Sequence, residues 1–152
     1  MDHVYAISTA KTEYREGYNT GDVHRVLAVF ADAFIDMSEG QSSTFGTSAQ
    51  TALRARLTDL FANYDVTVGM MICDIAVAAD GLTAFDYGWH KFWLTSKSGG
   101  ERLFFKLKYF EQWKLIDGSW KITYLITSKE ENPRMVPRPE SEVVAELAMA
   151  AG

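Results

Sequence analysis

The feature that most constrains the fold is a change in the spacing of apolar residues at Asp65. Before this residue, apolar side chains recur every three or four positions, as they do on one face of an amphipathic helix. After it, they alternate with polar side chains, which is typical of β-strands. Because helical patterns fill the first part of the chain and strand patterns fill the second, the sequence predicts an α+β fold.

The first part of the chain predicts three helices. Gly21 ends the first, at residues 3–18, and Asp22 is a natural N-cap for a short second helix. The segment Thr47-Ser48-Ala49-Gln50 is interpreted as a capping box that starts the third. The stripes expected to face the core are Val4, Ile7, Ala10, Lys11, Tyr14 and Tyr18 in the first helix, Val26, Leu27, Val29 and Phe30 in the second, and Leu53, Leu57, Leu60, Phe61 and Tyr64 in the third.

Three turns divide the second part into four strands. Asp80-Gly81 and Asp117-Gly118 are pairs that favour tight hairpins, and the segment 96–100 is rich in serine and glycine. An antiparallel meander is therefore expected, with strands at about 65–79, 82–95, 101–116 and 119–129.

Three prolines near the C-terminus predict the end of the sheet and the start of a linker. They are Pro133, Pro137 and Pro139. We therefore expect one domain over residues 1–130, followed by a segment over 131–152 that ends in a short helix, SEVVAELAMA.

Composition narrows the class of protein. A chain of 152 residues, 47% of them hydrophobic, suits one well-packed domain. A net charge of −5 without a basic cluster argues against nucleic-acid binding, since phosphate contacts need positive charge. The N-terminus lacks the pattern of a signal peptide, and no segment approaches the roughly 20 apolar residues of a membrane span. The single cysteine, Cys73, is expected to be buried as a small hydrophobic residue. One cysteine cannot form an internal disulfide, which fits a reducing compartment, so the chain is predicted to be cytoplasmic.

The strands are expected to present large aromatic side chains on one surface. The third long strand points Glu111 to its apolar side. Such a surface predicts either a ligand-sized hydrophobic cavity or a filled core, and the pattern does not decide between them. The rows expected to share this surface are Phe85, Tyr87, Trp89 and Trp93; Phe105, Leu107, Tyr109, Glu111, Trp113 and Leu115; and Trp120, Ile122, Tyr124 and Ile126.

The order of these segments resembles the nuclear-transport-factor-2-like superfamily, and within it the SnoaL-like and ketosteroid-isomerase-like proteins. The resemblance covers residues 3 to about 128 and is carried by GYNTGDVHRVLAVFAD, GTSAQTALRARLTDLFA and DGSWKI. It implies a cystatin-like, cone-shaped roll in which three N-terminal helices pack on a curved antiparallel β-sheet. It also implies a homodimer formed through the convex face of the sheet.

The resemblance also implies candidate catalytic residues. Ketosteroid isomerase uses an Asp general base with an oxyanion hole made by a Tyr and a protonated Asp. Tyr14 falls at the position of that tyrosine, and Glu111 falls near the position of the protonated acid. Ser38 occupies the general-base position, and Asp36 lies two residues earlier on the same strand face.

These three residues suggest a proton transfer without metal or cofactor. A desolvated Glu111 would stay protonated and stabilise an enolate together with Tyr14, while Asp36 removes the proton alpha to a carbonyl. Structural roles remain as alternatives: Tyr14 fits the helix stripe, Glu111 could form an ion pair, and Asp36 could bind backbone amides. His90 is expected at a subunit contact, and no His or Cys spacing supports a metal site.

The predicted function is therefore the binding of a small hydrophobic molecule, with isomerase, cyclase or dehydratase chemistry of the kind just described. The alternative is a non-catalytic ligand-binding or dimerisation module. Neither nucleic acid nor a membrane is expected as a partner. The residues expected to contact the molecule are Tyr18, Ser38, Phe61, Phe85, Tyr87, Trp89, Tyr109, Trp113 and Tyr124.

Overall fold

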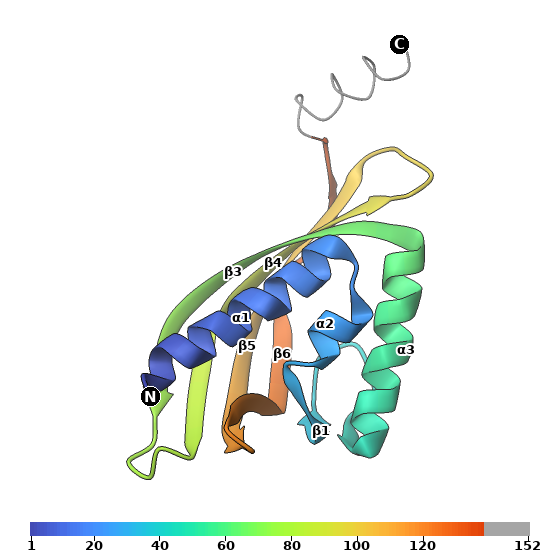
Figure 1. Cartoon of the computed structure of the whole chain (residues 1–152). Helices are drawn as coiled ribbons and strands as arrows, with labels where there is room; N and C mark the ends of the chain where they lie inside the picture. Colours follow the sequence, from blue (N-terminus) through green and yellow to red (C-terminus); the bar gives the residue numbers. More distant parts are fainter. Residues whose placement is uncertain (139–152) are drawn as a thin grey trace, which may run out of the picture.

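A computed structural model describes residues 1–138, in which three helices pack against one curved six-stranded sheet (Figure 1). The α+β prediction is therefore confirmed. The expected C-terminal helix lies outside the described residues. The elements are α1 (His3–Thr20), α2 (Val23–Leu27), β1 (Phe30–Asp36), β2 (Thr44–Gly46), α3 (Thr47–Asn63), β3 (Tyr64–Val77), β4 (Thr83–Ser96), β5 (Arg102–Ile116) and β6 (Ser119–Val136).

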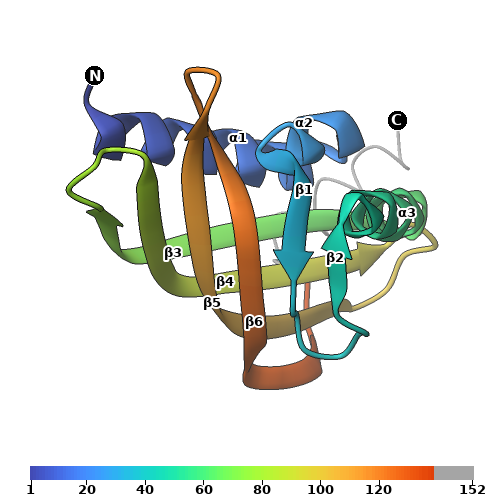
Figure 2. The ribbon, with the colours of Figure 1, turned by 90° about the horizontal axis from the view of Figure 1, so that it is seen from below.

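The strands run in the order β2-β1-β6-β5-β4-β3 across the sheet, as Figure 2 shows from below. The predicted meander forms β3 to β6, and each of its neighbouring pairs is antiparallel. The N-terminal strand β1 adds to it by pairing in parallel with β6, which places Asp36 opposite Leu125. The candidate acid at the end of β1 is thus placed beside the middle of β6.

Helix α1 lies across the concave side of the sheet, called the inner face below (Figure 1). Asp2 caps its start by accepting a hydrogen bond from the backbone N–H of Tyr5, and Gly21 ends it in a left-handed conformation with φ of 66°. Of the predicted stripe, Ile7, Lys11, Tyr14 and Tyr18 are buried, Ala10 is partly buried and Val4 is 46% exposed. Lys11 lies in the middle of this stripe and is itself buried.

The other two helices begin differently. Asp22 caps α2 as predicted, accepting from the backbone N–H of Arg25 at 3.1 Å. The predicted capping box of α3 is wrong, because Gly46 is the N-cap and makes no side-chain cap bond. β2 leads into the helix through this glycine, whose φ is 69°, so Thr47 is already helical.

The prediction for β4 is wrong about which residues face the helices. The buried residues of this strand alternate through Ala84, Asp86, His90 and Phe92. Asp86 pairs directly with Glu111 of β5, and directly opposite residues share a face of the sheet. Lys11 above this pair supplies the positive charge that lets a polar row face inward. The expected row Phe85, Tyr87, Trp89 and Trp93 therefore lies on the convex face, called the outer face below.

Partway along strand β6, the side chains that face the helices change from one alternating set to the other. The register with β5 shifts between Trp113–Ile122 and Gln112–Tyr124, so one extra residue of β6 is inserted. Because a one-residue shift moves every later side chain to the other face, Leu125 and not Tyr124 is buried beneath the helices. The expected inward positions of Tyr124 and Ile126 are wrong for this reason.

The same strand is longer than expected and runs through Pro133 to Val136. Its register with β5 shifts again between the pairs Phe104–Arg134 and Lys106–Glu131, and Pro133 falls within this irregular part. Proline lacks the N–H that a regular ladder needs, and it is tolerated where a bulge interrupts the ladder.

Cys73 is exposed, so its expected burial is wrong. It lies at a register shift between Ile72 and Asp74 on β3, the strand at one edge of the sheet. The shifted backbone passes so close to Gly88 of β4 that a Cβ atom there would lie 1.9 Å from the carbonyl oxygen of Met71. The irregularity of β3 therefore needs a glycine opposite it.

Candidate functional site

A cavity of about 400 Å³ lies between the helices and the inner face of the sheet. We call it the inner cavity. Aromatic and aliphatic side chains form its walls, and exposed acidic residues such as Glu39 and Asp59 lie at its edge. Its lining residues are Tyr14, Tyr18, Asp36, Ser38, Glu39, Gln41, Leu53, Arg56, Leu57, Asp59, Leu60, Tyr64, His90, Phe92, Leu107, Leu125 and Thr127.

His90 is a buried polar group in the wall of this cavity, with 1% of its side chain exposed. Its ring stacks on Tyr109 with ring centroids 4.1 Å apart, and the Tyr14 ring lies 5.8 Å away. Burial lowers the pKa of His90 well below its ordinary value, and the nearby Lys11 ammonium lowers it further. His90 is therefore a neutral imidazole near pH 7.

Lys11 connects this histidine to two buried acids. Its Nζ lies 3.4 Å from His90 Nε2, 2.9 and 3.1 Å from the two oxygens of Glu111, and 3.6 Å from Asp86 Oδ1. All four side chains are at most 2% exposed. A buried charge needs a partner, and the ion pair with Glu111 satisfies this need for Lys11.

The cluster contains two carboxyl groups but one cation. Asp86 accepts a hydrogen bond from the Trp113 indole N–H at 2.6 Å. Burial raises the pKa of Glu111 well above its ordinary value; the Lys11 charge opposes this shift, and the neighbouring Asp86 adds to it. One proton shared by the two acids would balance the single positive charge.

Two phenol groups of α1 line the inner cavity beside His90. Burial raises the pKa of Tyr14 well above its ordinary value and raises that of Tyr18 to about 12. The two rings meet edge to face, with centroids 5.2 Å apart. Both tyrosines therefore keep their O–H at neutral pH and can donate a hydrogen bond.

Asp36 lines the inner cavity from β1 with both carboxylate oxygens occupied. Oδ1 accepts from the backbone N–H and the hydroxyl of Ser38, at 3.1 and 2.6 Å. Oδ2 accepts from Gln41 at 3.1 Å and from the Arg56 guanidinium at 2.8 Å. The carboxylate thus joins β1, the loop after it and helix α3.

Four of the sequence-derived candidates come together at the inner cavity: Tyr14, Tyr18, Asp36 and Ser38. Glu111 and Trp113 lie beneath α1 in the Lys11 cluster, and Phe61 packs on Tyr18 with ring centroids 5.8 Å apart. Tyr109 lies under His90. The candidates on the outer face are Phe85, Tyr87, Trp89 and Tyr124.

The sequence interpretation missed Lys11 and His90 as a pair. It placed His90 at a subunit contact, whereas the structure buries it against α1. One signal was present: a lysine at a core position of a helix stripe requires a buried acceptor or acid nearby. Glu111 was already expected on the apolar side of its strand, and it is the partner of Lys11.

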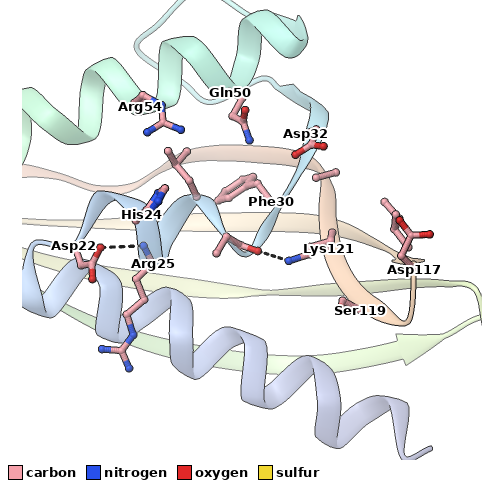
Figure 3. Close-up of a pocket in the computed structure, with 14 residues that line it drawn as sticks. Asp22, His24, Arg25, Phe30, Asp32, Gln50, Arg54, Asp117, Ser119 and Lys121 are labelled. Carbon is pink, nitrogen blue, oxygen red and sulfur yellow. Dashed lines mark hydrogen bonds between the residues drawn. The ribbon is translucent and has the colours of Figure 1, made fainter.

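A second hollow, of about 650 Å³, lies between α2, α3 and the turn that joins β5 to β6 (Figure 3). Arg54 and Gln50 of α3, His24 of α2 and Asp32 of β1 surround it. His24, Asp32 and Arg54 are exposed to solvent, and charges of both signs are mixed around the hollow. This arrangement favours no particular ligand.

Residues 1–138 show neither a metal-binding cluster nor a membrane-spanning helix. These residues contain no group of three or more His, Cys, Asp or Glu side chains placed to hold a metal ion. None of their helices is long and apolar enough to span a bilayer.

The comparisons with known proteins show a common fold. A ketosteroid isomerase-like protein from Erwinia carotovora atroseptica superimposes with a TM-score of 0.72 at 20% identity, over 86% of this chain and 98% of that one. Hexachlorocyclohexane dehydrochlorinase LinA-type3 from Novosphingobium barchaimii gives a TM-score of 0.65 at 14% identity, over 90% of each chain.

A third similar structure is named as a dehydratase of the NTF2-like family, from Streptomyces avermitilis. Its TM-score is 0.66 at 15% identity, over 85% of this chain and 96% of that one. No family model matches the sequence, and no curated protein matches it significantly. The likeness spans nearly the whole of each solved structure, so this chain has the nuclear-transport-factor-2-like fold.

Proposed function

We propose that the protein binds a small, mainly apolar molecule with a carbonyl oxygen in the inner cavity and moves a proton alpha to that carbonyl. The observation that carries the proposal is the neutral His90 beside the Tyr14 phenol in the wall of a cavity with Asp36. In this arrangement His90 and Tyr14 contact the carbonyl oxygen, and the Asp36 carboxylate is the base. No metal or cofactor is part of the proposal.

This proposal changes one of the roles suggested by the sequence. Glu111 was expected to donate a hydrogen bond to the substrate, but it is held by Lys11 and does not line the inner cavity. His90 takes that role in the proposal, with Glu111 behind it. Dehydratase and isomerase names among the similar structures support this class of reaction, because those reactions begin with proton removal.

Exchange of alpha protons in D₂O, followed by NMR on a set of aromatic and cyclic ketones, tests the proposal. We expect exchange faster than in buffer, and about a hundredfold less with Asp36→Asn or Tyr14→Phe. Tyr5→Phe changes an exposed tyrosine of the same helix and serves as the matched control. Exchange no faster than in buffer for every ketone would overturn the proposal.

Asp36 also has an anchoring role, which needs a separate control. Arg56→Gln removes the ion pair to Asp36 but keeps the carboxylate. Exchange that survives Arg56→Gln and is lost in Asp36→Asn assigns the effect to the base. Equal losses in both variants would mean that Asp36 acts only by holding the wall of the inner cavity.

The second candidate function is a non-catalytic ligand-binding module. The observation in its favour is that Asp36 already accepts four hydrogen bonds, so both of its oxygens are engaged by Ser38, Gln41 and Arg56. This candidate predicts that a ketone raises the melting temperature without any exchange of its alpha protons.

A further inference from the structure

The partners of Lys11 determine which way its hydrogen bonds point. A lysine ammonium has three N–H donors and no acceptor. Lys11 Nζ lies within 3.1 Å of both Glu111 oxygens and 3.6 Å from Asp86 Oδ1, so the ammonium group is held between two carboxyl groups and donates to Glu111. Its contact with His90 Nε2, at 3.4 Å, therefore requires the ring nitrogen to accept.

A neutral imidazole carries one N–H, so a histidine that accepts at Nε2 donates at Nδ1. Within residues 1–138, Lys11 is the one hydrogen-bond partner of the His90 ring, and Nδ1 has none. His90 lines the inner cavity, and the stacked Tyr109 ring holds its plane. The Nδ1–H group is thus left for a ligand.

We propose that Lys11 is a positioning residue that holds His90 in the Nδ1–H form, so that the inner cavity selects a ligand with a hydrogen-bond acceptor oxygen. The inference deepens the proposed function and rests on it, since the ligand is placed in the same cavity. It narrows the ligand class to molecules that present a carbonyl, carboxylate or phenolate oxygen to His90. Molecules of the same shape without such an oxygen bind more weakly.

The packing of α1 alone does not require this cluster. Replacement of a buried ion pair by apolar residues of similar volume is often neutral or stabilising. A Met and a Leu could fill the space of Lys11 and Glu111, yet the chain buries both charges next to a cavity histidine. The burial of Lys11 and Glu111 is accounted for if Lys11 determines which ring nitrogen of His90 donates a hydrogen bond and which accepts one.

The form of the His90 ring can be measured in the ligand-free protein by ¹H–¹⁵N correlation NMR of the imidazole nitrogens. His90→Gln identifies the signals among the three histidines of the chain. We expect a protonated Nδ1 and an unprotonated Nε2 in the wild type. The double variant Lys11→Met/Glu111→Leu removes both charges and should shift the population toward Nε2–H. A wild type with Nε2–H, or a double variant unchanged from it, would overturn the inference.

A pair of probes tests ligand selection. Acetophenone and 2-phenylpropene have the same shape, but the first carries a carbonyl oxygen. We expect the wild type to bind acetophenone about tenfold more tightly, as one hydrogen bond to a buried donor allows, and the double variant to lose this preference. Equal binding of both probes by the wild type, or an unchanged preference in the double variant, contradicts the inference.

The two experiments separate this inference from the proposed function. The NMR measurement needs no ligand, so it tests the role of Lys11 even if no ketone is turned over. The expected ring form with no alpha-proton exchange would leave Lys11 as a positioning residue in a binding protein. Exchange together with an Nε2–H ring would keep the proposed function and remove the role of Lys11.

Discussion

At the scale of single residues, the buried pair of Lys11 and Glu111 has an energetic consequence that depends on removing one or both charges. Glu111→Leu leaves the Lys11 charge with the more distant Asp86, so we expect a loss of about 3 kcal/mol in the free energy of unfolding. Lys11→Met added to Glu111→Leu removes the unpaired charge and should restore most of this loss.

Urea unfolding at neutral pH measures both variants. Glu131 forms an exposed ion pair with Arg134, and Glu131→Ala is the surface control, for which we expect little change. A single variant as stable as the wild type, or a double variant no more stable than Glu111→Leu alone, would contradict the description of a paired buried charge.

The lowered pKa of His90 makes folding stability depend on pH. In the unfolded chain this histidine takes up a proton near pH 6.5, but burial and the Lys11 charge resist protonation in the folded state. Its stabilising contribution is therefore complete above about pH 6.5 and is lost as the pH falls, by at most about 1.4 kcal/mol per pH unit. The raised pKa of Glu111 acts in the opposite direction, since its contribution is lost as the pH rises.

These opposing effects are separated by comparing the wild type with His90→Gln in urea between pH 5 and pH 7.5. We expect the stability of the wild type relative to this variant to decrease as the pH falls. A constant difference across the range would mean that His90 titrates alike in the folded and unfolded chain.

At the scale of elements, the irregularity in β3 depends on a glycine in β4. A Cβ atom at position 88 would lie 1.9 Å from the carbonyl oxygen of Met71, and backbone cannot move aside as a flexible side chain can. We expect Gly88→Ala to destabilise the protein by about 3 kcal/mol or more, as judged by the cost of overpacking.

Gly69 of β3 is the matched control. A Cβ atom there would meet only the Trp93 ring, at an ordinary 3.7 Å, so Gly69→Ala should change stability by less than about 1 kcal/mol. Thermal unfolding of the two variants checks the difference. Similar melting temperatures would show that β3 can shift away from β4 at Cys73.

At the scale of the whole molecule, the outer face of the sheet carries exposed apolar side chains that suit an interface. They come from the four neighbouring strands β3 to β6, and patches of this kind mark interaction sites. We propose that two copies associate through this face, as the family resemblance of the sequence implies. The exposed residues are Met71, Tyr87, Phe110 and Ile126.

Light scattering coupled to size exclusion measures the association. We expect a dimer for the wild type and a monomer for Tyr87→Lys/Phe110→Lys, because four buried charges would oppose the interface. Leu82→Lys changes an exposed residue at the turn before β4 and should leave the dimer intact. A monomeric wild type would reject the proposed interface.

Local signals in the sequence determined the helices and the four-stranded meander, although Phe30, expected in the second helix, begins β1. The change of period at Asp65 marks where α3 ends and the meander begins, and Asp22 capped a helix where a cap was expected. Asp117-Gly118 makes a tight turn with positive φ at both residues, as this pair favours. These features depend on residues within a few positions of one another, so they can be inferred without the fold.

Tertiary structure decided which side of each strand faces the helices. Strand β4 has aromatic residues on one side and a mixed row with Asp86 and His90 on the other, and either side could have been buried. Pairing with Glu111 and the position of Lys11 on α1 settled the choice, and an inserted residue reversed the later part of β6.

The candidate site likewise has features that the sequence predicts and features that only the tertiary structure determines. Tyr14 and Asp36 could be inferred from the sequence as residues near one cavity, although not the four hydrogen bonds that occupy Asp36. The role of Glu111 as the partner of Lys11 depends on residues 100 positions apart in the chain. A buried charge is stable only beside its partner, and only the docking of α1 onto the sheet brings these partners together.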